Sequence, residues 1–223
     1  AILAAATKSA TDATVALGEA IAGGSEAKFA DMMTRRARQL GMASTTFRNA
    51  SGLPHSKQKS TARDMATLAM ALLQDHKSYY KYFSTPEFEW NDRVFSNHNH
   101  LLKRYEGVDG IKTGYIRASG FNLVASAKRD GRRVIGVVFG GTSVKARDDR
   151  MIRLLDTAFE RFEDADENAP VMAQKDNGGT GFGLISNAEA TSAVPAKGKK
   201  VKKIDESAGD WAVQLGAFKK AAS

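Results

Sequence analysis

The chain has 223 residues and none of them is cysteine, which excludes disulfides and thiolate metal sites but leaves the cellular compartment open. No apolar run is long enough to cross a bilayer, and no basic-then-apolar signal peptide opens the sequence. An initiator methionine is also missing, and the first seven residues resemble the middle of a helix or loop. We therefore expect this chain to be a fragment.

Positive charge exceeds negative charge, with a formal net charge of +8 and a pI of about 9.6. Much of the excess lysine lies in one segment, residues 197–203, and no basic surface is interleaved with aromatic residues. This pattern favours a solvated tail over a nucleic-acid interface. Hydrophobic residues make up 42% of the chain, which is sufficient for a buried core.

Periodicity and turn residues predict one α+β domain over residues 1–163, with a helical part and an antiparallel sheet. Thr11 or Asp12 is expected to cap a first helix over residues 13–22, and Ser25 a second that ends near residue 40. Residues 61–64, Thr-Ala-Arg-Asp, have the spacing of a capping box before a third helix. Thr142 or Ser143 is expected to begin a long fourth helix, whose buried apolar stripe consists of Met151, Leu154, Leu155, Ala158 and Phe162.

Two hairpins are expected between these helices. One covers residues 87–95 and turns at Asn91-Asp92, and the other covers residues 121–139 and turns at Asp130-Gly131. The second hairpin follows Lys112-Thr113-Gly114, so this tripeptide is expected at the start of an antiparallel strand that faces a cleft. Lysine supplies a point charge, threonine a rotatable donor and glycine close backbone access, a combination suited to binding an anion.

The composition changes after Phe162. Residues 164–209 are rich in Ala, Lys, Asn, Gly and Ser and poor in aromatics, so we expect a disordered basic linker. Residues 210–223 then alternate like the start of a strand that has no partner within the sequence.

Histidine offers no metal site in this sequence. Of the four histidines only His98 and His100 are close, and their spacing on an expected loop fits no zinc motif. We interpret them as exposed polar residues. No phosphate-binding glycine loop is present either, and we expect neither a metal nor another cofactor.

Several ordered segments together resemble the transpeptidase-like domain of serine D-alanyl-D-alanine carboxypeptidases, the low-molecular-mass penicillin-binding proteins. The segments are residues 9–19, 47–53, 60–65 and 108–114 with the hairpin that follows. Residues 211–218 resemble the first strand of a SPOR domain, a small peptidoglycan-binding module. The resemblance implies a partial β-lactamase/transpeptidase-like fold in an enzyme of the periplasm or cell envelope. Such an enzyme removes the terminal D-alanine from peptidoglycan stem pentapeptides and is inhibited by β-lactams. A complete SPOR domain would bind glycan strands.

The family uses three motifs around one cleft: Ser-x-x-Lys, Ser-x-Asn and Lys-Thr-Gly. By resemblance, Ser9 is the serine of the second motif and relays protons to the leaving group. Lys112 favours an anionic substrate and tunes the cleft. Thr113 and Gly114 complete the third motif, and Thr113 is expected to bind the terminal carboxylate together with Arg147.

Two departures from the family pattern bear on activity. Thr11 stands where the family has asparagine in the second motif, and a hydroxyl reaches less far than an amide. The Ser-x-x-Lys motif that supplies the nucleophile is missing, because the local matches beginning at Ser25 and Ser56 both follow Ser9. We therefore expect the fragment to be inactive. The alternatives are a β-lactamase-like serine hydrolase or a non-catalytic peptidoglycan-binding protein.

Overall fold

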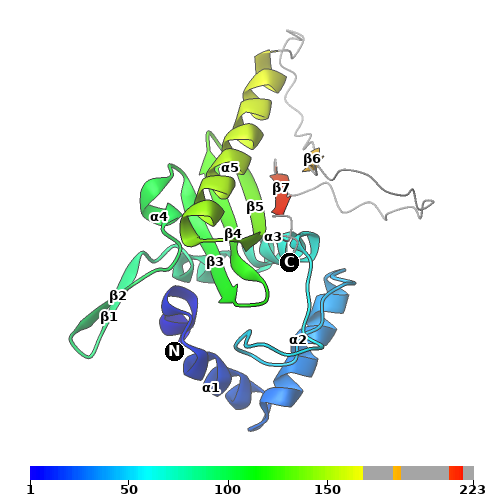
Figure 1. The fold of residues 1–223 in the computed structure, drawn as a ribbon, viewed down its shortest axis with the longest axis vertical. Coiled ribbons are helices and arrows are strands. Elements are labelled where there is room, and N and C mark those ends of the chain that lie inside the picture. The colour runs from blue at the N-terminus through cyan, green and yellow to red at the C-terminus, as the bar shows by residue number, and fades with distance from the viewer. Residues whose placement is uncertain (168–182, 187–210, 218–223) are drawn as a thin grey trace.

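The computed structural model describes the backbone of residues 1–167, 183–186 and 211–217 and has an α+β fold, as expected (Figure 1). The helical elements are η1 (Ala4–Lys8), α1 (Thr11–Ile21), α2 (Glu26–Gln39), α3 (Ala62–Asp75), η2 (Lys77–Tyr82), α4 (Leu101–Arg104) and α5 (Val144–Glu167). The strands are β1 (Glu87–Trp90), β2 (Arg93–Ser96), β3 (Val108–Ile116), β4 (Gly120–Arg129), β5 (Arg132–Gly141), β6 (Gly183–Ser186) and β7 (Trp211–Ala217).

The central sheet has the order β3-β4-β5-β7-β6. Its first three strands form an antiparallel meander, while β7 and β6 join in parallel, so the sheet is mixed rather than wholly antiparallel. Both predicted hairpins are confirmed, and their turn residues Asn91, Asp92 and Asp130 have the positive φ that a tight hairpin turn requires. Lys112 lies inside β3 instead of at its start, because pairing already begins at Val108.

Helices cover both faces of the meander. Side chains of β5 alternate between the two faces: Val134 and Val138 belong to the cluster packed under α5, whereas Ile135 packs with α3. At Gly136 an added Cβ would lie only 2.4 Å from the Met151 Sδ atom, so the absence of a side chain lets α5 approach the sheet.

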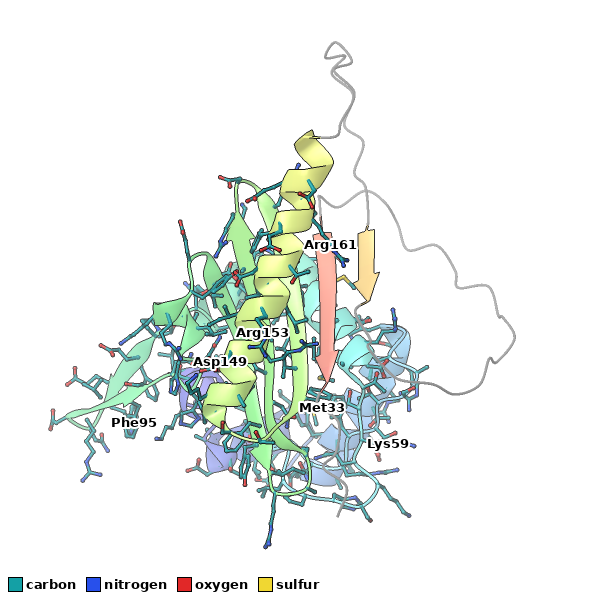
Figure 2. The ribbon with its side chains drawn as sticks, turned by 45° about the horizontal axis from the view of Figure 1, so that its top comes forward. Met33, Lys59, Phe95, Asp149, Arg153 and Arg161 are labelled. Carbon is teal, nitrogen blue, oxygen red and sulfur yellow. The ribbon has the colours of Figure 1, made fainter. Side chains whose placement is uncertain are left out.

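The predicted apolar stripe of α5 is confirmed. Four of its five residues, Met151, Leu154, Leu155 and Ala158, are buried in the core under this helix, and the fifth, Phe162, is partly buried against that core. Its outer side carries charged residues at helical spacing, namely Asp149, Arg153 and Arg161 (Figure 2). The helix begins as expected, with Ser143 Oγ accepting a hydrogen bond from the Ala146 amide at 3.0 Å.

One predicted helix start and one predicted capping box differ from the structure. The N-cap of α1 is Ala10, not Thr11 or Asp12, since the chain turns immediately after Ser9 and leaves both polar residues inside the helix. At α3, Thr61 accepts a hydrogen bond from the Asp64 amide, but Asp64 does not return one to complete a capping box. Its carboxylate instead accepts from the Ser44 amide and the Thr45 hydroxyl, which ties α3 to the preceding loop. Ser25 caps α2 as predicted.

Parts of the predicted linker and tail have regular structure. Helix α5 continues to Glu167, four residues beyond the expected domain boundary, through residues that include good helix formers. A short strand, β6, lies within the predicted linker, and β7 pairs with the edge of β5 rather than remaining unpartnered. An edge strand presents unpaired backbone groups, which an extended segment satisfies. Most of residues 168–209 lie outside the described part of the chain.

Helices α1 and α2 form an arm below the sheet (Figure 1). The arm buries few residues: α1 buries only Gly18, and α2 only Ala30 and Ala37. An apolar cavity of about 350 Å³ lies between α2 and α3. Its lining residues are Phe29, Met32, Met33, Arg36, Ala37, Leu40, Met42, Phe47 and Leu68.

Candidate active site

Ser9 lies in a sharp bend between two helical segments. It ends η1 with a left-handed backbone conformation, φ 60° and ψ 39°, and Ala10 then extends into α1. Non-glycine residues adopt this conformation infrequently, and the position is typical of functional bends. Thr7, two residues earlier, is fully buried and anchors this short segment, while Ser9 itself is exposed.

Lys112 reaches Ser9 from β3. Its Nζ atom donates to Ser9 Oγ at 2.5 Å and to the backbone oxygen of Thr113 at 2.8 Å. The two residues are 103 positions apart in sequence, so the fold alone brings them together. The structure thus unites the two residues that the resemblance had assigned to catalysis.

The Lys112 ammonium lies in an unfavourable environment for its charge. Burial first, and repulsion from Arg147 second, lower the pKa of Lys112 from its ordinary value of 10.5 to about 8. At pH 7 about one Lys112 side chain in ten is therefore neutral. In the charged form Lys112 donates to Ser9 Oγ, and in the neutral form it is able to accept a proton from it.

Arg147 is buried in an ion pair within the protein. Its Nε and Nη2 atoms donate to Asp148 Oδ1 at 2.9 and 2.7 Å, and its side chain is only 4% exposed. Asp148 is fully buried, and its second oxygen lies 3.7 Å from His100 Nδ1 and 3.5 Å from Arg104 Nη1. The expected contact of Arg147 with a substrate carboxylate stays a prediction. What the structure adds is the effect of Arg147 on the charge of Lys112.

The remaining predicted substrate-binding residues make few contacts within the protein. Thr11 is exposed in the first turn of α1, and among the described residues its hydroxyl makes no hydrogen bond. The backbone oxygen of Thr113 accepts from Lys112. Gly114 is exposed, and a Cβ added there would meet only the Asn122 Cβ at 3.9 Å. Its lack of a side chain is thus not required by packing within the described chain, and its role in substrate binding stays a prediction.

The loop of residues 97–100, which the sequence predicted to be polar and exposed, contacts both sides of this site. Asn97 and Asn99 are buried, whereas His98 and His100 are exposed as predicted. Asn99 Nδ2 donates to the Gly110 backbone oxygen at 3.0 Å, two residues before Lys112. The alternation of asparagine and histidine was the available signal, because a buried asparagine needs hydrogen-bond partners.

His98 faces the cations of the site. Burial first, and then the charges of Lys8 and Lys112, lower its pKa below the ordinary value.

No group of three or more potential metal-binding side chains occurs in the described residues. Similarly, none of the helices described is both long and apolar enough to span a membrane.

Neither local Ser-x-x-Lys match resembles a nucleophile site in the structure. Ser25 Oγ accepts from the Lys28 amide at 3.3 Å as a helix cap. Ser56 is exposed in a loop, and the backbone of Lys59 bridges to Thr46. Neither serine contacts Ser9 or Lys112 through a hydrogen bond among the described residues.

The family model for peptidase S11, D-alanyl-D-alanine carboxypeptidase, matches residues 2–143. The chain belongs to this family. It is 41% identical over 160 residues to D-alanyl-D-alanine carboxypeptidase DacF of Bacillus subtilis, covering 70% of this chain and 41% of that protein. It is 38% identical over 155 residues to DacD of Escherichia coli, covering 69% and 40%. This S11 chain therefore spans about two fifths of the length of these relatives.

Solved structures agree with this assignment. The D-alanyl-D-alanine carboxypeptidase DacD of Francisella tularensis superimposes with a TM-score of 0.68 at 30% identity, covering 71% of this chain and 51% of that one. Penicillin-binding protein D2 of Listeria monocytogenes, in a cefotaxime-bound form, gives a TM-score of 0.63 at 30% identity, covering 70% and 64%. The partial transpeptidase-like fold is thus the fold of this S11 chain.

Proposed function

We propose that these residues form one side of the active-site cleft of a serine D-alanyl-D-alanine carboxypeptidase. The observation that carries the proposal is the Lys112–Ser9 hydrogen bond, in which a lysine with a lowered pKa meets a serine from a distant segment. Membership in the S11 family supports the reaction class. The substrate is a peptidoglycan stem peptide that ends in D-alanyl-D-alanine.

The reaction proceeds through an acyl-enzyme. A nucleophilic serine attacks the carbonyl carbon of the penultimate D-alanine, the C–N bond breaks, and the terminal D-alanine leaves with a proton on its nitrogen. Ser9 and Lys112 deliver that proton, because their contact allows the hydroxyl to donate while the lysine replenishes it. Water then hydrolyses the ester. Thr113 binds the substrate carboxylate, and the charge of Arg147 adds to its attraction.

The nucleophile is not among the residues printed here. Ser25 serves as a helix cap and Ser56 as an exposed loop residue, so neither has a lysine base beside its hydroxyl in the described structure. The 223 residues alone are therefore inactive in acyl transfer. A separate Ser-x-x-Lys segment completes the cleft, and β-lactams acylate the completed site.

A chimera tests this proposal. The part of Bacillus subtilis DacF that precedes its matched region is fused to this chain, and release of D-alanine from a peptide ending in D-alanyl-D-alanine is measured. We expect release by the chimera and none by the chain alone. Ser9→Ala and Lys112→Ala in the chimera should each reduce kcat about 100-fold or more. A folded chimera whose rate is unaffected by either change would refute the assignment.

A second function is supported by the exposed hydroxyl of Thr11, which stands where the family has an amide. The protein would then bind peptidoglycan without cleaving it. Binding of the chain to isolated sacculi, with and without residues 164–223, tests this alternative. Retained binding without those residues, together with an inactive folded chimera, would favour it.

The cell envelope is the proposed place of action, since this is where the polymer is found. We also propose that residues 210–223 begin a SPOR-like unit, supported by the alternating sequence of Trp211–Ala217 and its strand conformation. Sacculus binding that falls when these residues are removed is the expected result.

A further inference from the structure

The contact between Ser9 and Lys112 depends on a connection between two separate segments. Among the described residues, two hydrogen bonds join residues 1–10 to segments beyond α1. One is the Lys112–Ser9 bond itself, and the other runs from the His98 amide to the Thr7 backbone oxygen at 3.3 Å. The loop that contains His98 is therefore the backbone link that holds the Ser9 segment in place.

The same loop is fixed to the strand that carries Lys112. Asn99 is 2% exposed, and its Nδ2 atom donates to the Gly110 backbone oxygen at 3.0 Å. Leu101, two residues further along the chain, is fully buried in the core under α5. One loop of four residues, 97–100, thus contacts the segment before Ser9 on one side and the segment before Lys112 on the other.

The loop is itself held rigidly by Asn97. Its Oδ1 atom accepts from the Asn99 amide at 2.8 Å, and its Nδ2 atom donates to the Thr85 backbone oxygen at 2.9 Å. The Asn97 amide also donates to the Pro86 backbone oxygen at 2.7 Å. Buried amide networks of this kind fix geometry, because each member left unpaired carries a desolvation cost.

We propose that Asn99 is a positioning residue that sets the distance between Ser9 and Lys112 by fixing the 97–100 loop to β3. This inference rests on the proposed function and deepens it, since Asn99 touches neither catalytic side chain and acts through the backbone of Gly110 and His98. Without the Asn99 amide, the loop loses its direct hydrogen bond to β3, and the loop and the Ser9 segment shift relative to that strand. The 2.5 Å contact is then lost while the sheet, which has its own core, remains folded.

The first test measures coupling between the two residues in the full chain. The Lys112 side chain is titrated by NMR of its 13Cε signal, with and without Ser9→Ala. In the native background, losing the hydroxyl acceptor destabilises the ammonium and lowers the titration midpoint by about 0.5 pH units. In an Asn99→Leu background the same change should have no effect, because the contact is already broken. An equal shift in both backgrounds would overturn the proposal.

A matched control is available at Asn49, whose Nδ2 atom also donates to a backbone oxygen, that of Leu53, at 2.9 Å. Asn49→Leu should leave the Ser9–Lys112 coupling intact, whereas loss of coupling in this control would contradict a specific role for Asn99. Asn99→Ser serves if Asn99→Leu does not fold, because the smaller side chain leaves room for a water to satisfy Gly110. It should reduce the coupling without unfolding the chain.

Cross-linking provides a second measurement. Its rate would not change if Asn99 had only a structural role. Because the chain has no cysteine, a Ser9→Cys/Lys112→Cys pair can be joined selectively by a short bifunctional thiol reagent whose length replaces that of the lysine side chain. We expect cross-linking by this reagent to slow about tenfold when Asn99→Ser is added, as the effective concentration falls. An unchanged rate would refute the proposal. Neither readout requires substrate, so failure here is distinct from an inactive chimera.

Discussion

The sheet with α5 and the arm formed by α1 and α2 are built very differently. Under α5 the core side chains Leu123, Val134 and Leu155 are completely inaccessible to solvent. The arm buries only Gly18, Ala30 and Ala37 within its two helices, and α2 borders an apolar cavity of about 350 Å³. Close packing on one side and a cavity on the other imply that the stability of the chain resides mainly in the sheet.

The candidate site lies where these two regions meet. Lys112 belongs to the well-packed sheet, whereas Ser9 precedes the arm and reaches the sheet through few contacts. Substitutions in the sheet should therefore change the free energy of unfolding, and those near the arm should change the site with little effect on stability. Each prediction below tests this contrast.

The largest effect is expected at Asp148, whose buried carboxylate compensates Arg147 and lies 3.5 Å from Arg104. Asp148→Asn should lower the free energy of unfolding by about 3–5 kcal/mol, because it leaves buried positive charge unpaired. Losing this anion should also lower the pKa of Lys112 further. Urea unfolding and the Lys112 NMR titration measure the two effects. Asp149→Asn is the control, since Asp149 is bound to Lys145 at the surface and should change little.

The packing contrast is tested directly by truncating one residue in each region. Leu155→Ala removes a fully buried side chain and should cost about 3 kcal/mol. Met32→Ala removes one that is 39% exposed beside the cavity, and should cost less than about 1 kcal/mol. Urea unfolding of both variants provides the comparison. Equal losses would show that the arm is as tightly packed as the sheet.

Lys112 should make stability depend on pH. Its pKa is 10.5 normally and about 8 in the folded chain, so between these values the unfolded state holds a proton that the folded state has lost. Stability from this group therefore rises with pH from about 8 to 10.5 and is lowest below pH 8. Over this pH range the free energy of unfolding changes by at most about 3 kcal/mol, and solvent screening reduces this change.

Lys112→Met removes both the free-energy cost of burying the ammonium and the pH dependence of stability that it causes. At pH 7 the variant should be more stable than the native chain by about 1–3 kcal/mol, with most of the slope between pH 8 and 10.5 abolished. Thermal unfolding across this pH range measures it. A variant that is less stable at pH 7 would mean that the charge of Lys112 is favourable where it lies.

The smallest effects concern the helix starts of the arm. Ser25→Ala should cost about 1 kcal/mol, because the Ser25 hydroxyl accepts from the Lys28 amide. Thr11→Ala should cost less, since the cap of α1 is Ala10 and not Thr11. Circular dichroism with urea unfolding distinguishes the two. A larger loss for Thr11→Ala would restore the predicted cap.

Local sequence patterns were sufficient wherever neighbouring residues determine the conformation. The turn at Asp130-Gly131, the cap at Ser25 and the apolar stripe of α5 were all predicted and confirmed. Prediction failed where a distant segment competes. Asp64 has the spacing to complete a capping box, but the Ser44 amide and Thr45 hydroxyl bind its carboxylate instead.

For the candidate site as well, the sequence predicted some features and not others. The resemblance to the family pointed to Ser9 and Lys112, but nothing in their spacing of 103 residues predicts contact. Burial of Asp148 beside Arg147 likewise arises from how α5 and α4 pack, which no local pattern contains. Asn99 was missed because the alternation of asparagine and histidine in residues 97–100 does not identify its partner, the Gly110 backbone oxygen.

The central claim is that this chain supplies Ser9 and Lys112 but not the nucleophile. Intact-mass analysis after incubation with a penicillin tests it most directly, on the chain alone and on the folded DacF chimera. The account predicts an unmodified chain and a single adduct on the chimera, mapped by peptide analysis to the serine of the added Ser-x-x-Lys segment. An adduct on the chain alone, at Ser9, Ser25 or Ser56, would contradict it.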